Sequence, residues 1–168
     1  MTIFTVTSSG RFLAPDGEYA AALGKSGVVA EADKREGDKA SPLGVYRLRR
    51  VLYRADRVAE PETRLPVRTI RDDDGWCDAP DDPAYNRPVR LPYPASCEEM
   101  KREDELYDII VILAHNDAPP VPGLGSAIFL HCAKPNHPPT LGCVALARAD
   151  LEAVLKLAQP GDLLEIRR

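Results

Sequence analysis

Two side chains in the last third of the chain pair a nucleophile with a base. Cys143 lies in the run Thr140-Leu141-Gly142-Cys143-Val144, and His131 stands 12 residues before it. An isolated thiol has a pKa of about 8.5, and a nearby imidazole can deprotonate it or hold it as an ion pair. Gly142 lets the backbone take an unusual φ, so that neighbouring N–H groups can form an oxyanion hole. From the residues alone, the alternative is an inert buried thiol and a structural histidine.

Other side chains are candidates for substrate contact. His115 and Asn116 follow a buried apolar run, and their alternative role is structural hydrogen bonding, because buried polar groups need partners. Trp76 and Asn86 could lie over a site as a lid, or pack within a loop. Thr140 belongs to the cysteine turn itself. We predict no metal and no cofactor, because the cysteines and histidines lack the close ligand pairs of a zinc site.

The elements that must position these groups are mostly short strands. Apolar alternation or apolar runs predict strands, and a helical spacing of apolar residues before Pro160-Gly161 predicts one helix. The expected strands cover 3–6, 11–13, 27–31, 45–53, 67–70, 89–91, 107–114, 126–130 and 162–166. The expected helices cover 147–158 and, from a capping box at Ser96-Cys97-Glu98-Glu99, about 97–103. Strands outnumber helices, which indicates a mainly β fold, a sandwich or barrel with one or two packed helices.

Composition excludes several classes of function. The 168 residues carry a net charge of −4, and residues 72–110 hold 12 acidic against 4 basic residues. A nucleic-acid partner is not expected, because phosphate contacts need a basic face. No apolar run reaches the length of a membrane span, and no secretory leader is visible at the start of the sequence. We expect one domain over residues 1–168, acting as a monomer.

Three segments together resemble the L,D-transpeptidase catalytic domain family, also called YkuD-like. Gly125–Leu146 resembles the family's strand ending in His, followed by a loop and Ser/Thr-x-Gly-Cys. Gly37–Tyr46 is similar to the Thr-Pro-x-Gly-x-Phe element, and Asp74–Asn86 is similar to a block found in a subgroup. The resemblance extends over most of Lys34–Arg168.

The resemblance implies a β-sandwich or barrel-like domain whose cysteine lies in a cleft. It also implies attack of the Cys143 thiolate on the carbonyl before the terminal D-residue of a peptidoglycan stem peptide or muropeptide. His131 is then the base, oriented by the Cys132 carbonyl, and the N–H groups of Gly142 and Cys143 bind the oxyanion. A thioacyl-enzyme forms, and a second amine or water resolves it.

Two positions depart from the family's commonest motif. Leu141 stands where a His is usual, and Ala145 stands where an Arg is common. Both departures favour hydrolysis, as by an L,D-carboxypeptidase or endopeptidase, or a different acceptor, as alternatives to cross-linking. A non-catalytic muropeptide-binding domain is a further alternative. The resemblance implies the cell envelope or periplasm as the location, and the cytoplasm is the alternative because no leader is visible.

Overall fold

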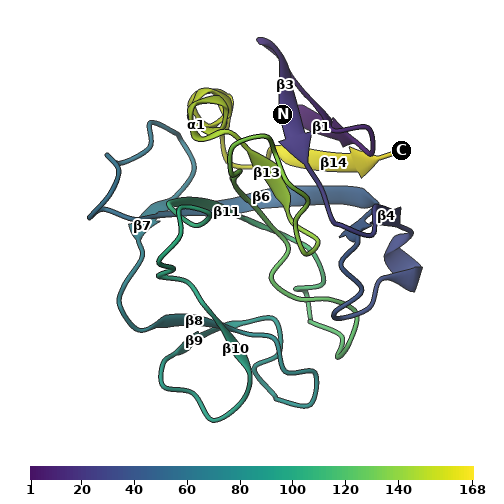
Figure 1. Cartoon of the computed structure of the whole chain (residues 1–168), viewed down its shortest axis with the longest axis vertical. Helices are drawn as coiled ribbons and strands as arrows, with labels where there is room; N and C mark the ends of the chain where they lie inside the picture. The colour runs from purple at the N-terminus through teal and green to yellow at the C-terminus, as the bar shows by residue number, and fades with distance from the viewer.

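A ring of β-strands forms the body of the protein. The computed structural model describes all residues from Met1 to Arg168. In order around the ring, the strands are β11 (Ile109–Leu113), β12 (Phe129–Cys132), β13 (Val144–Leu146), β3 (Gly17–Ala22), β2 (Arg11–Ala14), β1 (Ile3–Thr7), β14 (Leu163–Arg167) and β6 (Gly44–Tyr53). Because β6 also pairs with β11, the sheet closes into a barrel (Figure 1). A further strand, β7 (Val67–Thr69), pairs with β6 outside the ring.

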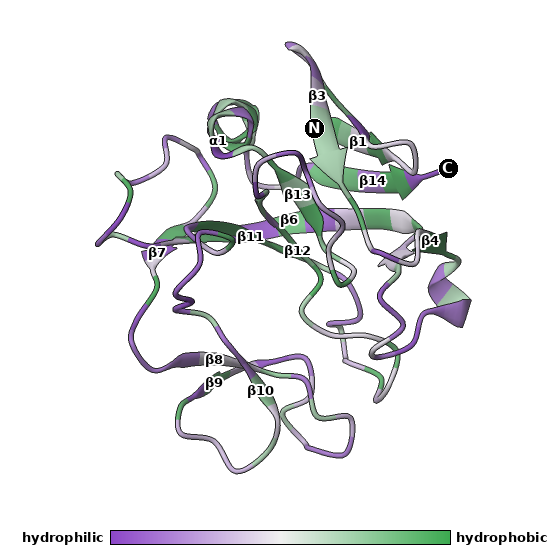
Figure 2. Cartoon of the chain, in the orientation of Figure 1, coloured by the Kyte–Doolittle hydropathy of each residue, from purple (hydrophilic) through white to green (hydrophobic).

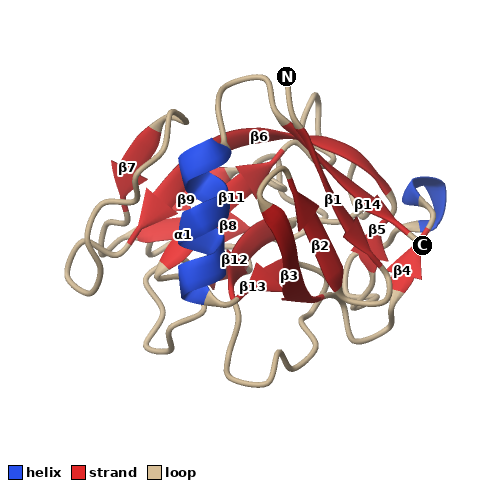
Figure 3. Cartoon of the chain, turned by 90° about the horizontal axis from the view of Figure 1, so that it is seen from above, coloured by secondary structure: helices blue, strands red, loops and turns tan.

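Two smaller sheets and one α-helix complete the fold. A three-stranded sheet contains β8 (Asp74–Cys77), β9 (Pro88–Arg90) and β10 (Cys97–Glu99), and it lies below the barrel in Figure 1. Beside the barrel, β4 (Val28–Val29) pairs with β5 (Ser41–Pro42), and a 3-10 turn covers Glu31–Asp33. The helix α1 (Arg148–Leu157) crosses in front of the strands in Figure 3. It is too short to cross a bilayer, and no other helix of the protein could do so.

The strand β11 shows why the central strands are continuously apolar. Ile109, Val111 and Leu113 face the core inside the barrel, which also receives Leu151, Val154 and Leu155 from α1. Ile110 and Ile112 face a second, smaller core, which includes Phe129 and Cys143. A strand buried on both faces has no solvent side on which polar residues would alternate. Figure 2 shows the contrast between β11, which is green, and β8, which is purple.

The mainly β, barrel-like architecture with a packed helix confirms the fold class predicted from the sequence. The strands expected near residues 3–6, 11–13, 45–53, 67–70, 89–91, 107–114 and 162–166, and the helix at 147–158, are present within a few residues of their expected bounds. The strand expected at 27–31 is shortened to β4, and no strand was predicted at the positions of β3, β5, β8, β10 and β13.

The helix predicted over residues 97–103 is wrong. Residues 97–99 form the strand β10, which pairs antiparallel with β8. Glu99, which would close the capping box with Ser96, lies opposite Gly75 in this pairing instead. Tertiary pairing with β8 therefore overrides the local capping signal.

The strand predicted over 126–130 begins later than expected. It runs as β12 from Phe129 to Cys132, so His131 lies within the strand and not after its end. Ala127 has a positive φ of 53°, which takes it out of the ladder, and its N–H donates to the side chain of Asn86 at 3.1 Å. A side-chain acceptor therefore replaces a strand partner at this position.

Candidate active site

Cys143 is held by a turn that two hydroxyl groups fix. Gly142 has a φ of 134°, and a Cβ on it would come within 3.0 Å of the carbonyl oxygen of Ala40, so only glycine fits there. The hydroxyl of Ser41 donates to the carbonyl of Gly142 at 2.8 Å. The hydroxyl of Thr140 donates to the carbonyl of Cys143 at 2.6 Å. These two hydrogen bonds hold the turn, which leads directly into β13.

The thiol of Cys143 is engaged with backbone groups. Its sulfur accepts a hydrogen bond from the N–H of Phe129 at 3.3 Å, and its S–H points to the carbonyl of Ala127 at 3.2 Å. Burial, and secondarily the charge of Glu98, raise the pKa of this thiol to about 12. The sulfur is therefore protonated at neutral pH in the absence of substrate.

His131 is neutral, and one of its ring nitrogens is free to accept a proton. Its Nδ1 lies 2.8 Å from the carbonyl oxygen of Cys132. A carbonyl only accepts, so Nδ1 carries the proton and Nε2 is the basic nitrogen. Burial lowers the pKa of His131 to about 4. The side chain packs edge-on against Tyr107, with ring centroids 5.4 Å apart.

The two groups come from neighbouring strands and share one cavity. β12 and β13 are parallel, and His131 lies opposite Ala145, two residues after Cys143. Side chains two apart on a strand share a face. The cavity has a volume of about 470 Å³, and both Cys143 and His131 line it together with Thr140, Leu141 and Ala145. No hydrogen bond joins the thiol to the imidazole, because the S–H is turned toward Ala127.

The walls of this cavity carry charges of both signs. Its basic side chains are Lys34, Lys39, Arg102 and Lys134, and its acidic side chains are Glu36, Asp78 and Glu98. Glu98 accepts a short hydrogen bond from the hydroxyl of Tyr107, and Arg102 lies over the Tyr107 ring at 5.2 Å from its centroid. Burial raises the pKa of Glu98. Glu98 and Arg102 were not predicted as site residues, because a helix over 97–103 would not place them beside the cysteine.

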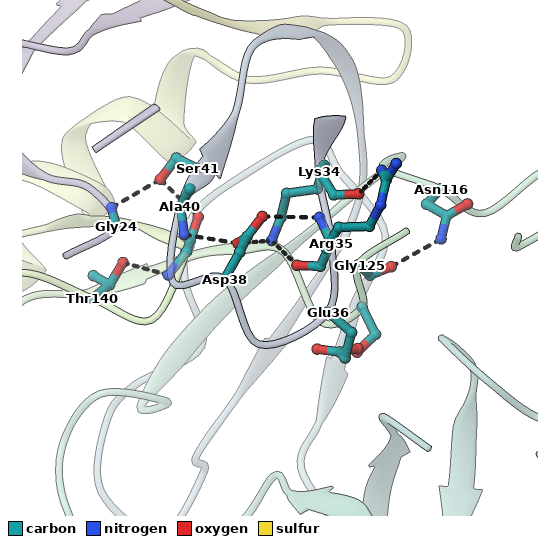
Figure 4. Close-up of polar contacts among 12 residues, drawn as sticks. Gly24, Lys34, Arg35, Glu36, Asp38, Ala40, Ser41, Asn116, Gly125 and Thr140 are labelled. Atoms are coloured by element: carbon teal, nitrogen blue, oxygen red, sulfur yellow. Dashed lines mark hydrogen bonds and ion pairs between the residues drawn. The ribbon is translucent and has the colours of Figure 1, made fainter. Parts of the chain in front are cut away.

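A second wall is formed by the loop before β5. Lys34 is buried with 3% of its surface exposed, and its ammonium donates to Asp38 at 2.5 Å (Figure 4). Asp38 also accepts from the N–H groups of Arg35 and Ala40, both at 2.9 Å. The loop is therefore internally bonded, and it continues into Ser41, which holds the cysteine turn. The motif Gly37–Tyr46 singled out in the sequence thus positions Gly142 through Ser41.

Of the five predicted substrate-binding residues, only Thr140 lines the cavity. The side chain of Asn86 is buried, accepts from Trp76 Nε1 at 2.9 Å and donates to the carbonyls of Asn116 at 2.7 Å and His115 at 3.1 Å. With its bond to the Ala127 N–H, it makes four hydrogen bonds to the chain. These bonds hold the backbone of Ala127, whose carbonyl accepts the hydrogen bond from the Cys143 thiol. Asn86 and Trp76 therefore act on the site indirectly, by positioning Ala127.

His115 and Asn116 lie behind the same backbone. His115 is buried against Tyr46, with ring centroids 5.4 Å apart, and its Nδ1 has no hydrogen-bond partner. Burial lowers its pKa to about 4. The Asn116 amide donates to the carbonyl of Gly125 at 2.9 Å (Figure 4). The Asn116 side chain is therefore used in loop hydrogen bonds, whereas the His115 ring is held by packing.

The expected oxyanion donors differ in availability. The N–H of Gly142 donates to the Thr140 hydroxyl at 3.1 Å, so it is engaged inside the turn. The N–H of Cys143 has no backbone acceptor. In this conformation the N–H of Cys143 is free to donate a hydrogen bond to an oxyanion. Gly142 does not donate one, and its role is to provide the backbone conformation of the turn.

Comparisons with known proteins identify the family of the chain. The profile of the YkuD L,D-transpeptidase catalytic domain matches residues 2–166. Among solved structures, that of L,D-transpeptidase 1 from Mycobacterium tuberculosis aligns with 99% of this chain at 12% identity and a TM-score of 0.43. The chain spans 61% of the length of that protein. A search of curated proteins gave no match. The profile match extends over almost the whole chain, and the chain belongs to the YkuD family of L,D-transpeptidase catalytic domains.

Proposed function

We propose that the protein is a cysteine acyltransferase that acts on peptidoglycan stem peptides, with Cys143 as nucleophile and His131 as base. One observation carries the proposal: a thiol and a neutral imidazole with a free Nε2 line the same cavity of about 470 Å³. Cys143 belongs to the smaller core, and His131 lies on the same face of β12 as Phe129 of that core, so neither side chain fills the main barrel core.

Reaction begins with a rotation of the thiol. The S–H leaves the Ala127 carbonyl and turns to Nε2 of His131, a change of one side-chain torsion between staggered positions. His131 takes the proton as the sulfur attacks the peptide carbonyl carbon. The thiol and the imidazole are both neutral at rest, so proton transfer accompanies attack and no ion pair precedes it.

The tetrahedral intermediate then collapses to a thioacyl-enzyme. The oxyanion accepts a hydrogen bond from the N–H of Cys143. One such donor commonly stabilises the transition state by about 3–4 kcal/mol. The C–N bond breaks, and the imidazolium of His131 gives its proton to the departing amine. His131 next deprotonates the incoming amine or water, which attacks the thioester and releases the thiol.

The charged walls suit a zwitterionic peptide. Stem peptides carry free carboxylates and an amino group, which would pair with basic and acidic side chains respectively. We assign Arg102 as a carboxylate anchor, because it lies on the cavity wall and is already fixed by Asp104 at 2.6 and 2.8 Å. In this chain Arg102 would supply the positive charge that the family's common Arg provides at the position of Ala145. Glu98, next to it, would receive an amino group.

Hydrolysis is a second candidate, favoured by the acceptor side of the cavity. Leu141, at the cavity rim, is 77% exposed and offers no polar atom to hold an incoming amine. A water molecule can attack the thioester without a side chain that binds an acceptor amine. The thioacyl step is the same in both reactions, so the choice depends on which nucleophile reaches the thioester.

We further propose that the chain works as a monomeric single domain in the cell envelope, where the family's peptidoglycan substrates lie. The test is incubation with purified tetrapeptide muropeptides, followed by mass spectrometry of the products. Cross-linked dimers would support transpeptidation, and tripeptides without dimers would support hydrolysis. Unchanged muropeptides with active-site binding alone would contradict the proposed activity.

A further inference from the structure

The sheet beside the cavity places two cysteines directly opposite each other. In the antiparallel pairing of β8 with β10, Cys77 is the partner of Cys97. Backbone hydrogen bonds join two other pairs of this ladder: the Asp78 N–H donates to the Ser96 carbonyl at 3.2 Å, and the Met100 N–H donates to the Asp74 carbonyl at 3.0 Å. Bonded and non-bonded pairs alternate along such a ladder, so the cysteine pair is a non-hydrogen-bonded one.

This type of pair has the spacing that a disulfide needs. Its Cα atoms are about 4.5 Å apart, and its side chains are the closest of the ladder. Disulfides join Cα atoms that are about 4.4–6.8 Å apart. Both thiols are free in this structure. Burial, and then the neighbouring Cys77 thiol, raise the pKa of Cys97 to about 11.

The pair lies on the face of the sheet that points away from the barrel. Trp76 faces the barrel, since its ring packs edge-on against Phe129 at 5.0 Å between centroids. Neighbouring residues of a strand point to opposite faces, so Cys77 and Cys97 lie behind the sheet. Cys77 is fully buried, whereas Cys97 is partly exposed and donates to the carbonyl of Ala95 at 3.4 Å.

We propose that Cys77 and Cys97 form a redox-controlled disulfide that fastens β8 to β10 beside the cavity. Each cysteine precedes an acidic residue of the cavity wall, Asp78 and Glu98 respectively. The bond would therefore fix the distance between two carboxylates that face the substrate. It would also close the segment between the cysteines into a loop, which restricts the unfolded chain.

The reaction needs an external disulfide, such as oxidised glutathione. The thiolate of Cys97, the more exposed group, attacks one sulfur of that disulfide and releases one reduced thiol. The thiolate of Cys77 then attacks the Cys97 sulfur of the mixed disulfide and releases the second. Two protein thiols are oxidised and one small disulfide is reduced to two thiols, with one proton lost from each cysteine and gained by each leaving thiolate.

The remaining two cysteines serve as internal controls. Cys132 lies in the main barrel core, and Cys143 lies in the cavity. Neither stands opposite another cysteine in a strand pairing. A link specific to this structure must therefore join Cys77 to Cys97 and leave Cys132 and Cys143 as thiols.

The test is oxidation of the folded chain with oxidised glutathione, alkylation of the remaining thiols and tryptic peptide mapping. Cleavage after Arg71, Arg90 and Lys101 places the two cysteines on separate peptides, 72–90 and 91–101. We expect these two peptides to appear joined, with free thiols falling from four to two, and reductant to reverse both changes. The Cys143→Ala variant should give the same joined pair.

Two results would overturn the proposal. One is glutathione attached to Cys97 alone with Cys77 still alkylated, and the other is a link that forms only after denaturant is added. A Cys97→Ala variant supplies the matched control for stability. Oxidation should raise the denaturant midpoint of the wild-type chain and leave that of Cys97→Ala unchanged. An equal shift in both proteins would count against the link as its cause.

Discussion

The clearest consequence of the site geometry is a slow-reacting nucleophile in the absence of substrate. A pKa of about 12 for Cys143, against about 8.5 for an ordinary thiol, lowers the thiolate population at neutral pH roughly three-thousandfold. A more basic thiolate is intrinsically more nucleophilic, with a Brønsted slope of about 0.4–0.5, which recovers roughly 40-fold. Alkylation of Cys143 by iodoacetamide should therefore be about a hundredfold slower than that of an ordinary thiol.

The assay is site-resolved mass spectrometry of Cys143 alkylation between pH 6.5 and 9.5, with a peptide of residues 138–146 as the ordinary thiol. The pKa lies above this range, so the rate should rise about tenfold per pH unit without a plateau. His131→Ala should change this rate little, because the imidazole is neutral and holds no ion pair. Fast alkylation that levels off below pH 8 and is lost in His131→Ala would refute the reasoning, since it would show a resting thiolate–imidazolium pair.

Three further changes follow from the same geometry. Glu98→Gln removes a charge that raises the pKa of Cys143, so alkylation above the carboxyl's own pKa should become faster; a slower rate would contradict the assignment. Arg102→Met should raise the KM for a substrate with a free carboxylate by about tenfold or more, since a charged hydrogen bond is worth about 1.5–3 kcal/mol, and should leave kcat less affected. His115 and His131 each have a pKa lowered to about 4, so the unfolded state binds their protons first as pH falls below about 6.5. The free energy of unfolding should then fall between pH 6.5 and 4, by up to about 3 kcal/mol per histidine, and His115→Leu should remove one of the two contributions in urea titrations.

The barrel strands could be predicted because the pattern of apolar and polar residues along each strand reflects which of its faces are buried. The run at 107–114 is continuously apolar because β11 is buried on both faces, and the alternation at 45–53 follows the two faces of β6. Local rules failed where a distant partner decides the conformation. Ser96 and Glu99 resemble a capping box in the sequence, yet the pairing of β10 with β8 places Glu99 in a strand opposite Gly75.

The site shows the same limit. Cys143 and His131 could be paired from their residue types and from the family resemblance, but the parallel pairing of β12 with β13 that brings them together was not predicted. Asn86 was expected to contact substrate, because the sequence shows that its side chain is polar but does not show the four hydrogen bonds that it makes within the chain. Arg102 and Glu98 could not be found, since they reach the cavity from a separate small sheet and the loop after it. Only the folded chain brings that segment to the cysteine.

The most direct test of the proposed chemistry is intact-mass analysis of the protein quenched with acid during incubation with a tetrapeptide muropeptide. We expect a transient adduct on Cys143 with the mass of the substrate acyl group minus the terminal residue. The Cys143→Ala variant should show neither adduct nor product. Product formation that persists in Cys143→Ala, or turnover by the wild-type chain with no adduct at Cys143 at any quench time, would contradict acyl transfer through this cysteine.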